Sequence, residues 1–143
     1  MKQLEIDTPF GPARAHIERV DDPRGALVLG HGAGGGITAR DLVAVARVAC
    51  RTAESTGAAG VLCLAFPLRP PRRSGSASAP SRLPELDAVT VPMLVVQGTG
   101  DRFGMPPSTE RRLVVQVPGD HSLRGELGAV TETVRAWLLR FVD

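Results

Sequence analysis

Four short apolar runs constrain the fold of this chain more than any other feature of its sequence. They are continuous rather than alternating, with Gln116 the one polar residue within them, and they comprise Ala26 to Leu29, Val61 to Phe66, Met93 to Val96 and Leu113 to Val117. Runs of this length are too short for helices, and a strand with one wet face would alternate polar and apolar residues. Continuous apolar strands are typical of parallel sheets whose two faces are both covered. We therefore expect an α/β fold built on a parallel sheet.

The N-terminal residues predict a different kind of strand pairing. Segments 2–7 and 13–20 have the pattern of two strands, and Thr8 to Pro12 between them holds two prolines and a glycine. Proline and glycine supply the backbone angles of tight turns. This order predicts an antiparallel hairpin at the start of the fold.

Two helices are predicted from their capping residues and apolar spacing. The first begins with Thr38 to Asp41, which resembles a capping box with Asp in place of Glu, and stops at Gly57. The second runs from about Glu126 to Phe141, where apolar residues recur at helical spacing. We expect the first helix to lie on the sheet, and the second to cover the other face or an edge.

The segment between Phe66 and Met93 has another composition. It is rich in Pro, Arg and Ser, most densely from Arg69 to Ser78. This composition is too polar and too interrupted by proline for a core element, so we expect a surface loop. A lid or a binding arm is the less favoured alternative.

Length and charge narrow the class of protein. The chain has 143 residues, 43% of them hydrophobic, which predicts a single domain over 1–143. Its formal charge is +2, with 17 basic and 15 acidic residues, so no strong field favours a nucleic acid or a membrane as partner. No apolar run is long enough to cross a bilayer, and we expect a cytoplasmic protein.

The two cysteines give no sign of a metal site. Cys50 lies in the first predicted helix and Cys63 in a predicted strand, both in apolar surroundings. Neither has the Cys or His spacing that zinc sites use. We expect reduced core residues, and no metal or cofactor is expected.

Three polar segments follow predicted parallel strands, where loops converge on one rim of the sheet. A glycine-rich loop runs from Gly30 to Gly36, Asp101 follows the third strand, and His121 follows the fourth. Acyl transfer needs a nucleophile, a base, an acid that orients the base, and backbone N–H donors for the oxyanion. An oxyanion loop, an acid and a base in this order match the α/β-hydrolase arrangement.

Other interpretations of these segments are less favoured. Gly30 to Gly36 lacks the Lys-Ser/Thr of a P-loop and has no acidic residue about 20 positions downstream at a strand end, which disfavours nucleotide binding. Asp120 is a rival acid, but its position next to His121 points it away from the imidazole. A lone His after a strand would be unremarkable without the acid loop.

Three stretches together resemble one family. They are Leu29 to Gly36 (LGHGAGGG), Val95 to Gly104 (VVQGTGDRFG) and Gly119 to Leu123 (GDHSL). They are similar to bacterial α/β-hydrolases related to dienelactone hydrolases and to the testis-expressed and chromatin-complex hydrolase-like proteins. The resemblance also covers Val61 to Pro71 and implies a shortened three-layer sandwich of about six strands, mostly parallel, with the N-terminal hairpin. It makes Asp101 and His121 the catalytic acid and base, and assigns the oxyanion loop to Gly30, His31, Gly32, Ala33 and Gly34.

One junction departs from the family pattern. In the family, two strands and two helices separate the glycine loop from the helix behind the nucleophile, which Ala46 to Ala53 resembles. Here Asp41 to Val45 runs directly into that helix, and no G-x-S-x-G motif occurs in the chain. The place of the serine falls on or near Val43, at a junction spanning Val43 to Ala46. We therefore identify no nucleophile.

Substitute nucleophiles are disfavoured on physical grounds. Cys50 is expected to be buried, and a buried apolar thiol is inert unless its pKa is lowered. Ser122 adjoins His121 and would need an unusual turn. Ser74, Ser76 and Ser78 lie on a loop that cannot hold a nucleophile in place.

These observations give three functional hypotheses. The favoured one is an ester- or dienelactone-hydrolase-like protein with little or no activity. The second is an esterase in which Asp101 and His121 activate water. The third is an anion- or nucleotide-binding module that uses the glycine loop with Thr38 at a helix N-terminus. A small ester or lactone is the expected substrate of an active form, and apolar surface left by the shortened sheet predicts a homodimer.

Overall fold

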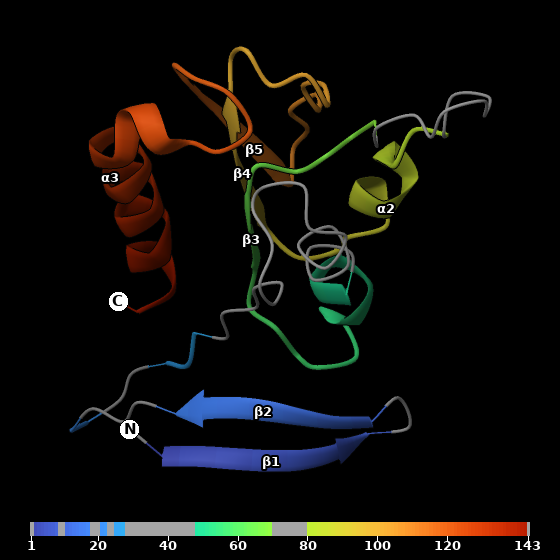
Figure 1. The fold of residues 1–143 in the computed structure, drawn as a ribbon, viewed down its shortest axis with the longest axis vertical. Coiled ribbons are helices and arrows are strands. Elements are labelled where there is room, and N and C mark those ends of the chain that lie inside the picture. Colours follow the sequence, from blue (N-terminus) through green and yellow to red (C-terminus); the bar gives the residue numbers. More distant parts are fainter. Residues whose placement is uncertain are drawn as a thin grey trace.

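The computed structural model describes residues 2–8, 11–17, 21–22, 25–27, 48–69 and 80–142. Its centre is a parallel sheet of three strands, shown in Figure 1. The strands are β3 (Val61–Leu64), β4 (Met93–Gly98) and β5 (Arg112–Val117), in the order β3-β4-β5. Met93 is in register with Val61 on one side and Arg112 on the other. The parallel pairing predicted from the apolar runs is confirmed for these three strands.

The middle strand β4 organises the core. All six of its residues are buried, as expected for a strand covered on both faces. Its side chains alternate between two apolar clusters, because successive residues of a strand point to opposite faces. Met93 and Val95 belong to one cluster, and Leu94 and Val96 belong to the other.

One face of the sheet is covered by the C-terminal helix α3 (Leu127–Leu138), which is preceded by η1 (Arg124–Glu126) and followed by η2 (Leu139–Phe141). Val130 and Trp137 of α3 pack in the cluster that contains Leu94 and Val96. In Figure 1 the helix lies along one side of the sheet. The predicted helix over 126–141 is thus confirmed, with its last turn tightened into a 3-10 helix.

The other face is covered by two short helices. Residues 48–52 are helical, and Gly57 beyond them has φ +66°, the left-handed angle expected at a helix stop. The second helix is α2 (Leu83–Asp87), with a proline in its first turn. Cys50 and Ala53 from the first helix and Leu86 from α2 share one cluster with Val61 and Met93 of the sheet.

Helix α2 corrects the prediction that the whole segment from Phe66 to Met93 lies outside the core. Leu86 is only 2% exposed and Val89 only 8%, so this part of the segment contributes to the core. The helix is short, and its few apolar residues give no helical period in the sequence. Tertiary burial of Leu86 and Val89 outweighs the weak local signal. Residues 70–79, the most Pro- and Arg-rich part, lie outside the described residues.

The N-terminal strands form a second sheet. The strands β1 (Lys2–Thr8) and β2 (Gly11–Ile17) pair antiparallel, with Lys2 opposite Ile17 and Thr8 opposite Gly11. Thr8, Gly11 and Pro12, predicted as turn residues, therefore belong to the strands. In the described residues this hairpin is not hydrogen-bonded to the parallel sheet, so they hold five strands in two sheets rather than one sheet of about six.

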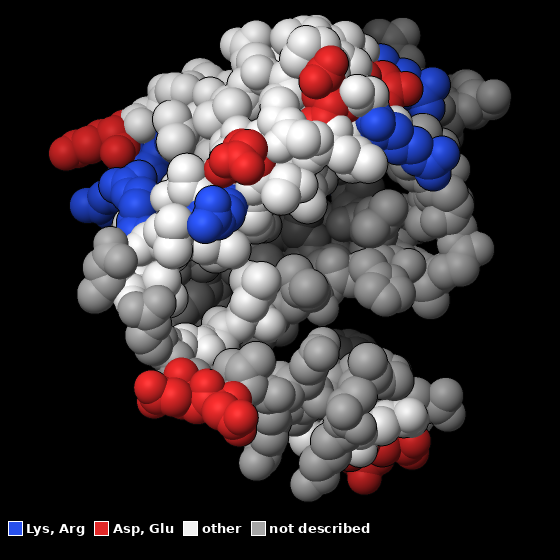
Figure 2. Space-filling view, turned by 90° about the vertical axis from the view of Figure 1, so that its left-hand side faces the viewer, with Lys and Arg blue, Asp and Glu red and all other residues white. Residues whose placement is uncertain are grey.

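Two predicted elements fall largely outside the described residues. Of the run Ala26 to Leu29, Ala26 and Leu27 are not in a strand, and residues 28–29 are not described. The start of the first helix at Thr38 to Asp41 and the junction from Val43 to Ala46 are likewise not described. In the described part of the chain, no helix is long and apolar enough to cross a membrane. On the face in Figure 2, acidic and basic side chains lie interspersed above the hairpin, in keeping with the near balance of charge.

Candidate functional site

The loop that carries Asp101, called the acid loop below, spans residues 98–104 and begins where β4 ends. The backbone N–H of Thr99 still bonds Val117 O at 2.9 Å, which continues the pairing with β5. Asp101 N then donates to Gly98 O at 3.1 Å, and Gly104 N donates to Asp101 O at 3.1 Å, so the chain makes two tight turns around Asp101. Gly104 has φ +96°, an angle that favours glycine. These turns hold Asp101 at the carboxyl end of the central strand.

The loop that carries His121, called the base loop below, spans residues 118–123 after β5 and crosses close to the acid loop. Gly100 N donates to Gly119 O at 2.8 Å and ties the two loops together. A Cβ placed on Gly98 would lie 2.6 Å from Gly119 O, so only glycine allows this approach. Leu123 N closes the loop on Asp120 O at 3.2 Å. The crossing brings His121 next to Asp101.

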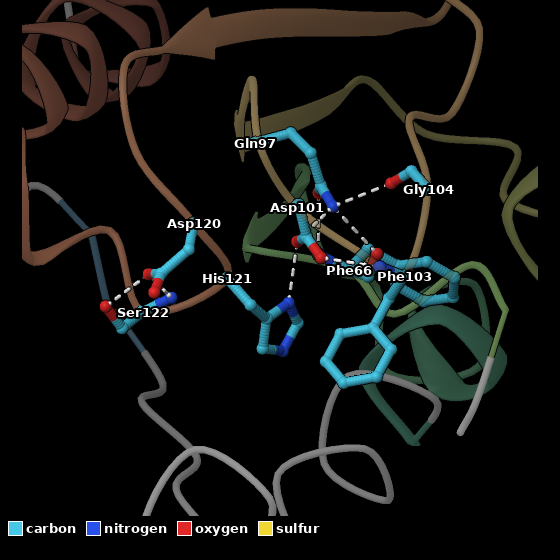
Figure 3. A network of polar contacts seen from close by, with 8 residues as sticks. All are labelled: Phe66, Gln97, Asp101, Phe103, Gly104, Asp120, His121 and Ser122. Carbon is cyan, nitrogen blue, oxygen red and sulfur yellow. Dashed lines mark hydrogen bonds and ion pairs between the residues drawn. The ribbon is translucent and has the colours of Figure 1, made fainter. Parts of the chain in front are cut away.

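Asp101 and His121 form a direct pair at the centre of Figure 3. His121 Nδ1 lies 2.7 Å from Asp101 Oδ2. The Asp101 side chain is 0% exposed, and that of His121 is 12% exposed. A buried carboxylate that accepts a bond from Nδ1 selects the tautomer with the proton on Nδ1, which leaves Nε2 as the basic nitrogen. No bond to Nε2 is found among the described residues.

Two neighbours hold this pair in place. The backbone N–H of Phe103 donates to Asp101 Oδ1 at 2.8 Å, and Gln97 Nε2 donates to Asp101 Oδ2 at 2.6 Å. The Phe103 ring meets the imidazole of His121 edge to face, with centroids 4.7 Å apart and planes at 83°. The carboxylate is thus fully satisfied, and one side of the imidazole is walled by an aromatic ring.

Asp120 is occupied elsewhere. Its Oδ1 accepts the backbone N–H of Ser122 at 2.8 Å and the Ser122 hydroxyl at 2.6 Å. These two bonds hold the pKa of the Asp120 carboxyl below its ordinary value. Figure 3 shows Asp120 and Ser122 turned toward each other and away from the imidazole of His121. Asp120 therefore does not compete with Asp101, and Ser122 donates to Asp120 rather than to His121.

Several residues singled out in the sequence lie outside the described residues. They are the whole glycine-rich loop with its oxyanion candidates Gly30, His31, Gly32, Ala33 and Gly34, the helix start at Thr38, and the loop serines Ser74, Ser76 and Ser78. Their roles stay predictions.

The two cysteines lie together in the core. Cys50 and Cys63 are free, buried and members of the same apolar cluster. The interaction between the two thiols, followed by burial, raises the pKa of Cys63 well above its ordinary value, and the same interaction lowers the pKa of Cys50 against the opposing effect of burial. Within the described ranges, no group of three or more His, Cys, Asp or Glu residues could hold a metal ion.

Two cavities in the described core lie away from the Asp101–His121 pair. One, of about 300 Å³, is lined by Met93 and Arg112 at the opposite end of the strands from Asp101. The other, of about 360 Å³, is lined by Cys50 and Ala53 on the helical side. Neither is lined by Asp101 or His121. Sequence reasoning missed Gln97 and Phe103, although Gln97 is the one amide in an otherwise apolar strand.

Comparison with known proteins gives one match. A family model described as an alpha/beta hydrolase domain matches residues 45–126. The matched range spans the parallel sheet and includes both Asp101 and His121. No curated protein and no solved structure matches the chain significantly.

Proposed function

The chain belongs to the alpha/beta hydrolase domain family, and from this premise we propose that it is an ester- or lactone-hydrolase-like protein that keeps the acid and the base but has no serine nucleophile. The acid is Asp101 and the base is His121. Within the family we place it with the dienelactone-hydrolase-like proteins, as a single domain over residues 1–143.

The Asp101–His121 hydrogen bond carries this proposal. Its length of 2.7 Å and the full burial of the carboxylate match the requirement for an orienting acid. The two residues are 20 positions apart and come from loops after neighbouring parallel strands, which supports a functional rather than a merely local contact. The family match supports the hydrolase class, and the oxyanion loop at Gly30 to Gly34 is proposed from the sequence alone.

The missing nucleophile limits what the pair can do. No G-x-S-x-G motif occurs in the sequence, and Ser122 donates its hydroxyl to Asp120. In a serine hydrolase, removal of the serine lowers kcat by about 10⁶-fold. We therefore propose that the chain has little or no acyl-transfer activity of its own.

Steady-state and burst kinetics with p-nitrophenyl acetate test the proposal. We expect no burst of p-nitrophenol, because no acyl-enzyme forms, and a rate equal to that of the His121→Ala variant. His16→Ala is the matched control for nonspecific imidazole catalysis, since His16 lies in the hairpin strand β2. A stoichiometric burst in the wild-type protein would contradict the proposal.

A second candidate function is general-base activation of water by the same pair. It is favoured by one observation: Nε2 of His121 has no partner among the described residues, while its side chain is 12% exposed. A water bound there could lose its proton to Nε2 as it attacks an ester carbonyl. Slow turnover without a burst that is lost in His121→Ala and kept in His16→Ala would establish this function in place of the first.

The anion-binding alternative rests on residues that the structure does not describe. Gly30 to Gly36 and Thr38 supply it in the sequence alone. Titration calorimetry with nucleotides at millimolar concentration tests it, and an absence of heat would eliminate it.

A further inference from the structure

Gln97 is an unusual residue for its place in the fold. It lies in β4, whose other members apart from the terminal glycine are apolar, and it is 0% exposed. Burial of an amide without hydrogen bonds is unfavourable, so a buried Gln must have partners. The structure gives its amide four partner atoms, which belong to Phe66, Asp101 and Gly104.

The contacts of Gln97 fix the orientation of its amide. Oε1 accepts the backbone N–H of Phe66 at 2.9 Å. Nε2 lies 2.6 Å from Asp101 Oδ2, 3.0 Å from Gly104 O and 3.1 Å from Phe66 O. The reverse orientation would set Oε1 against three oxygens and Nε2 against a donor. One Nε2 hydrogen therefore goes to Asp101, and the other is shared between the two carbonyls.

We propose that Gln97 is a positioning residue that fixes Asp101 Oδ2 where it accepts the proton of His121 Nδ1. This inference rests on the proposed function in taking Asp101 and His121 as acid and base. Asp101 Oδ1 is held by Phe103 N, but this single backbone bond leaves the carboxylate free to pivot about Oδ1. The Gln97 bond removes that freedom, because it meets the same oxygen that His121 uses.

Gln97 also joins the acid loop to the loop after β3. Its amide bonds both the N–H and the C=O of Phe66, which follows β3, as well as Gly104 in the acid loop. A second tie runs beside it, from Arg69 N to Phe103 O at 2.8 Å. A shift of residues 66–69 would therefore displace the Gln97 amide and, with it, the Asp101 carboxylate. Asp101 is positioned by the sheet, by its own loop and by the neighbouring loop together.

Nitrogen NMR of histidine-labelled protein tests the proposal without requiring any activity. The ratio of Nδ1–H to Nε2–H tautomer in neutral His121 reports directly whether Asp101 is in place. We expect the Nδ1–H form to predominate in the wild-type protein, and the ratio to fall about tenfold in Gln97→Met, the change expected for loss of one hydrogen bond to a charged group. Gln97→Glu should lower it too, because Glu keeps an acceptor for Phe66 N but donates nothing to Asp101 when ionised.

The neighbouring strand offers a matched control. Gln116 is the register partner of Gln97 on β5 and is exposed, so Gln116→Met makes the same chemical change next door. It should leave the His121 tautomer unchanged. A Gln97 variant that folds and keeps the wild-type tautomer ratio would overturn the proposal, because Gln97 would then only link the two loops.

A second measurement covers the case in which neither Gln97 variant folds. The side-chain NH₂ of Gln97 should show one strongly downfield, slowly exchanging proton, and Asp101→Asn should shift it. An unshifted Gln97 resonance would overturn the proposal. A burst of ester hydrolysis would contradict the proposed lack of a nucleophile alone, since the tautomer and the amide protons are read in the resting protein.

Discussion

Asp101 and Asp120 both lie near His121, and their surroundings give them different tasks. Asp101 is buried and accepts bonds from Phe103, Gln97 and His121. Asp120 is exposed, and both of its bonds come from Ser122 in a local turn. The two carboxylates lie in adjoining loops, and they differ in their burial and in the groups that donate hydrogen bonds to them.

The lowered pKa of Asp120 predicts how the stability of its turn depends on pH. Because its pKa is lowered in the folded protein, the turn contributes stability above the ordinary carboxyl pKa and loses it as the pH falls through the lowered value. Ser122→Ala removes the hydroxyl bond and should raise the Asp120 pKa part of the way back, which carboxyl-carbon NMR would measure. Ser108→Ala, whose hydroxyl accepts from Val114 N, is the control and should leave Asp120 unchanged. An Asp120 titration insensitive to Ser122→Ala would contradict the assignment.

The thiol pair makes a second prediction at the residue scale. The neighbouring Cys63 thiol lowers the pKa of Cys50, while the pKa of Cys63 itself is raised, and Cys50 lines the cavity of about 360 Å³. The thiolate is the form that reacts with alkylating agents. We expect iodoacetamide to modify Cys50 first and at lower pH, as read by peptide mass spectrometry. Cys63→Ala should slow the reaction of Cys50, and equal rates for both cysteines would refute this ordering.

At the scale of elements, the sequence was informative where a strong pattern matched the final burial. Continuous apolar runs located β3, β4 and β5, of which β4 is buried along its whole length, and helical spacing located α3 because it buries one stripe. Helix α2 was missed because five residues with a proline carry no period, and its burial depends on Leu86 meeting the core. Asp101 and His121 could be placed at one rim from strand order, but Gln97 could not, since a single amide gives no pattern.

Gly60 immediately precedes β3 and lies close against α3 and η2. A Cβ on Gly60 would lie 2.8 Å from Trp137 Cη2 and 3.0 Å from Phe141 Cζ and from Pro92 O. Gly60→Ala should therefore lower the free energy of unfolding by about 1–3 kcal/mol, the usual cost of overpacking. Urea unfolding measures it. Gly128→Ala on α3, where a Cβ meets nothing within 4 Å, should be neutral or stabilising; equal effects of the two changes would contradict this packing.

At the scale of the whole molecule, both outer strands of the parallel sheet leave apolar side chains exposed. Leu64 at the end of β3 is 54% exposed, and Leu113 on β5 is 46% exposed. Exposed apolar groups on sheet edges favour association. We predict a concentration-dependent dimer in sedimentation velocity, weakened by Leu113→Glu. A monomer at every concentration would contradict the prediction.

We propose that the chain keeps an oriented acid–base pair, Asp101 and His121, without a nucleophile for the pair to activate. Intact-protein mass spectrometry after incubation with a fluorophosphonate tests this most directly, because such reagents add covalently to an activated serine. We expect an unchanged mass for the wild-type protein and for His121→Ala alike. A stoichiometric adduct on any serine of the wild-type protein that disappears in His121→Ala would contradict it.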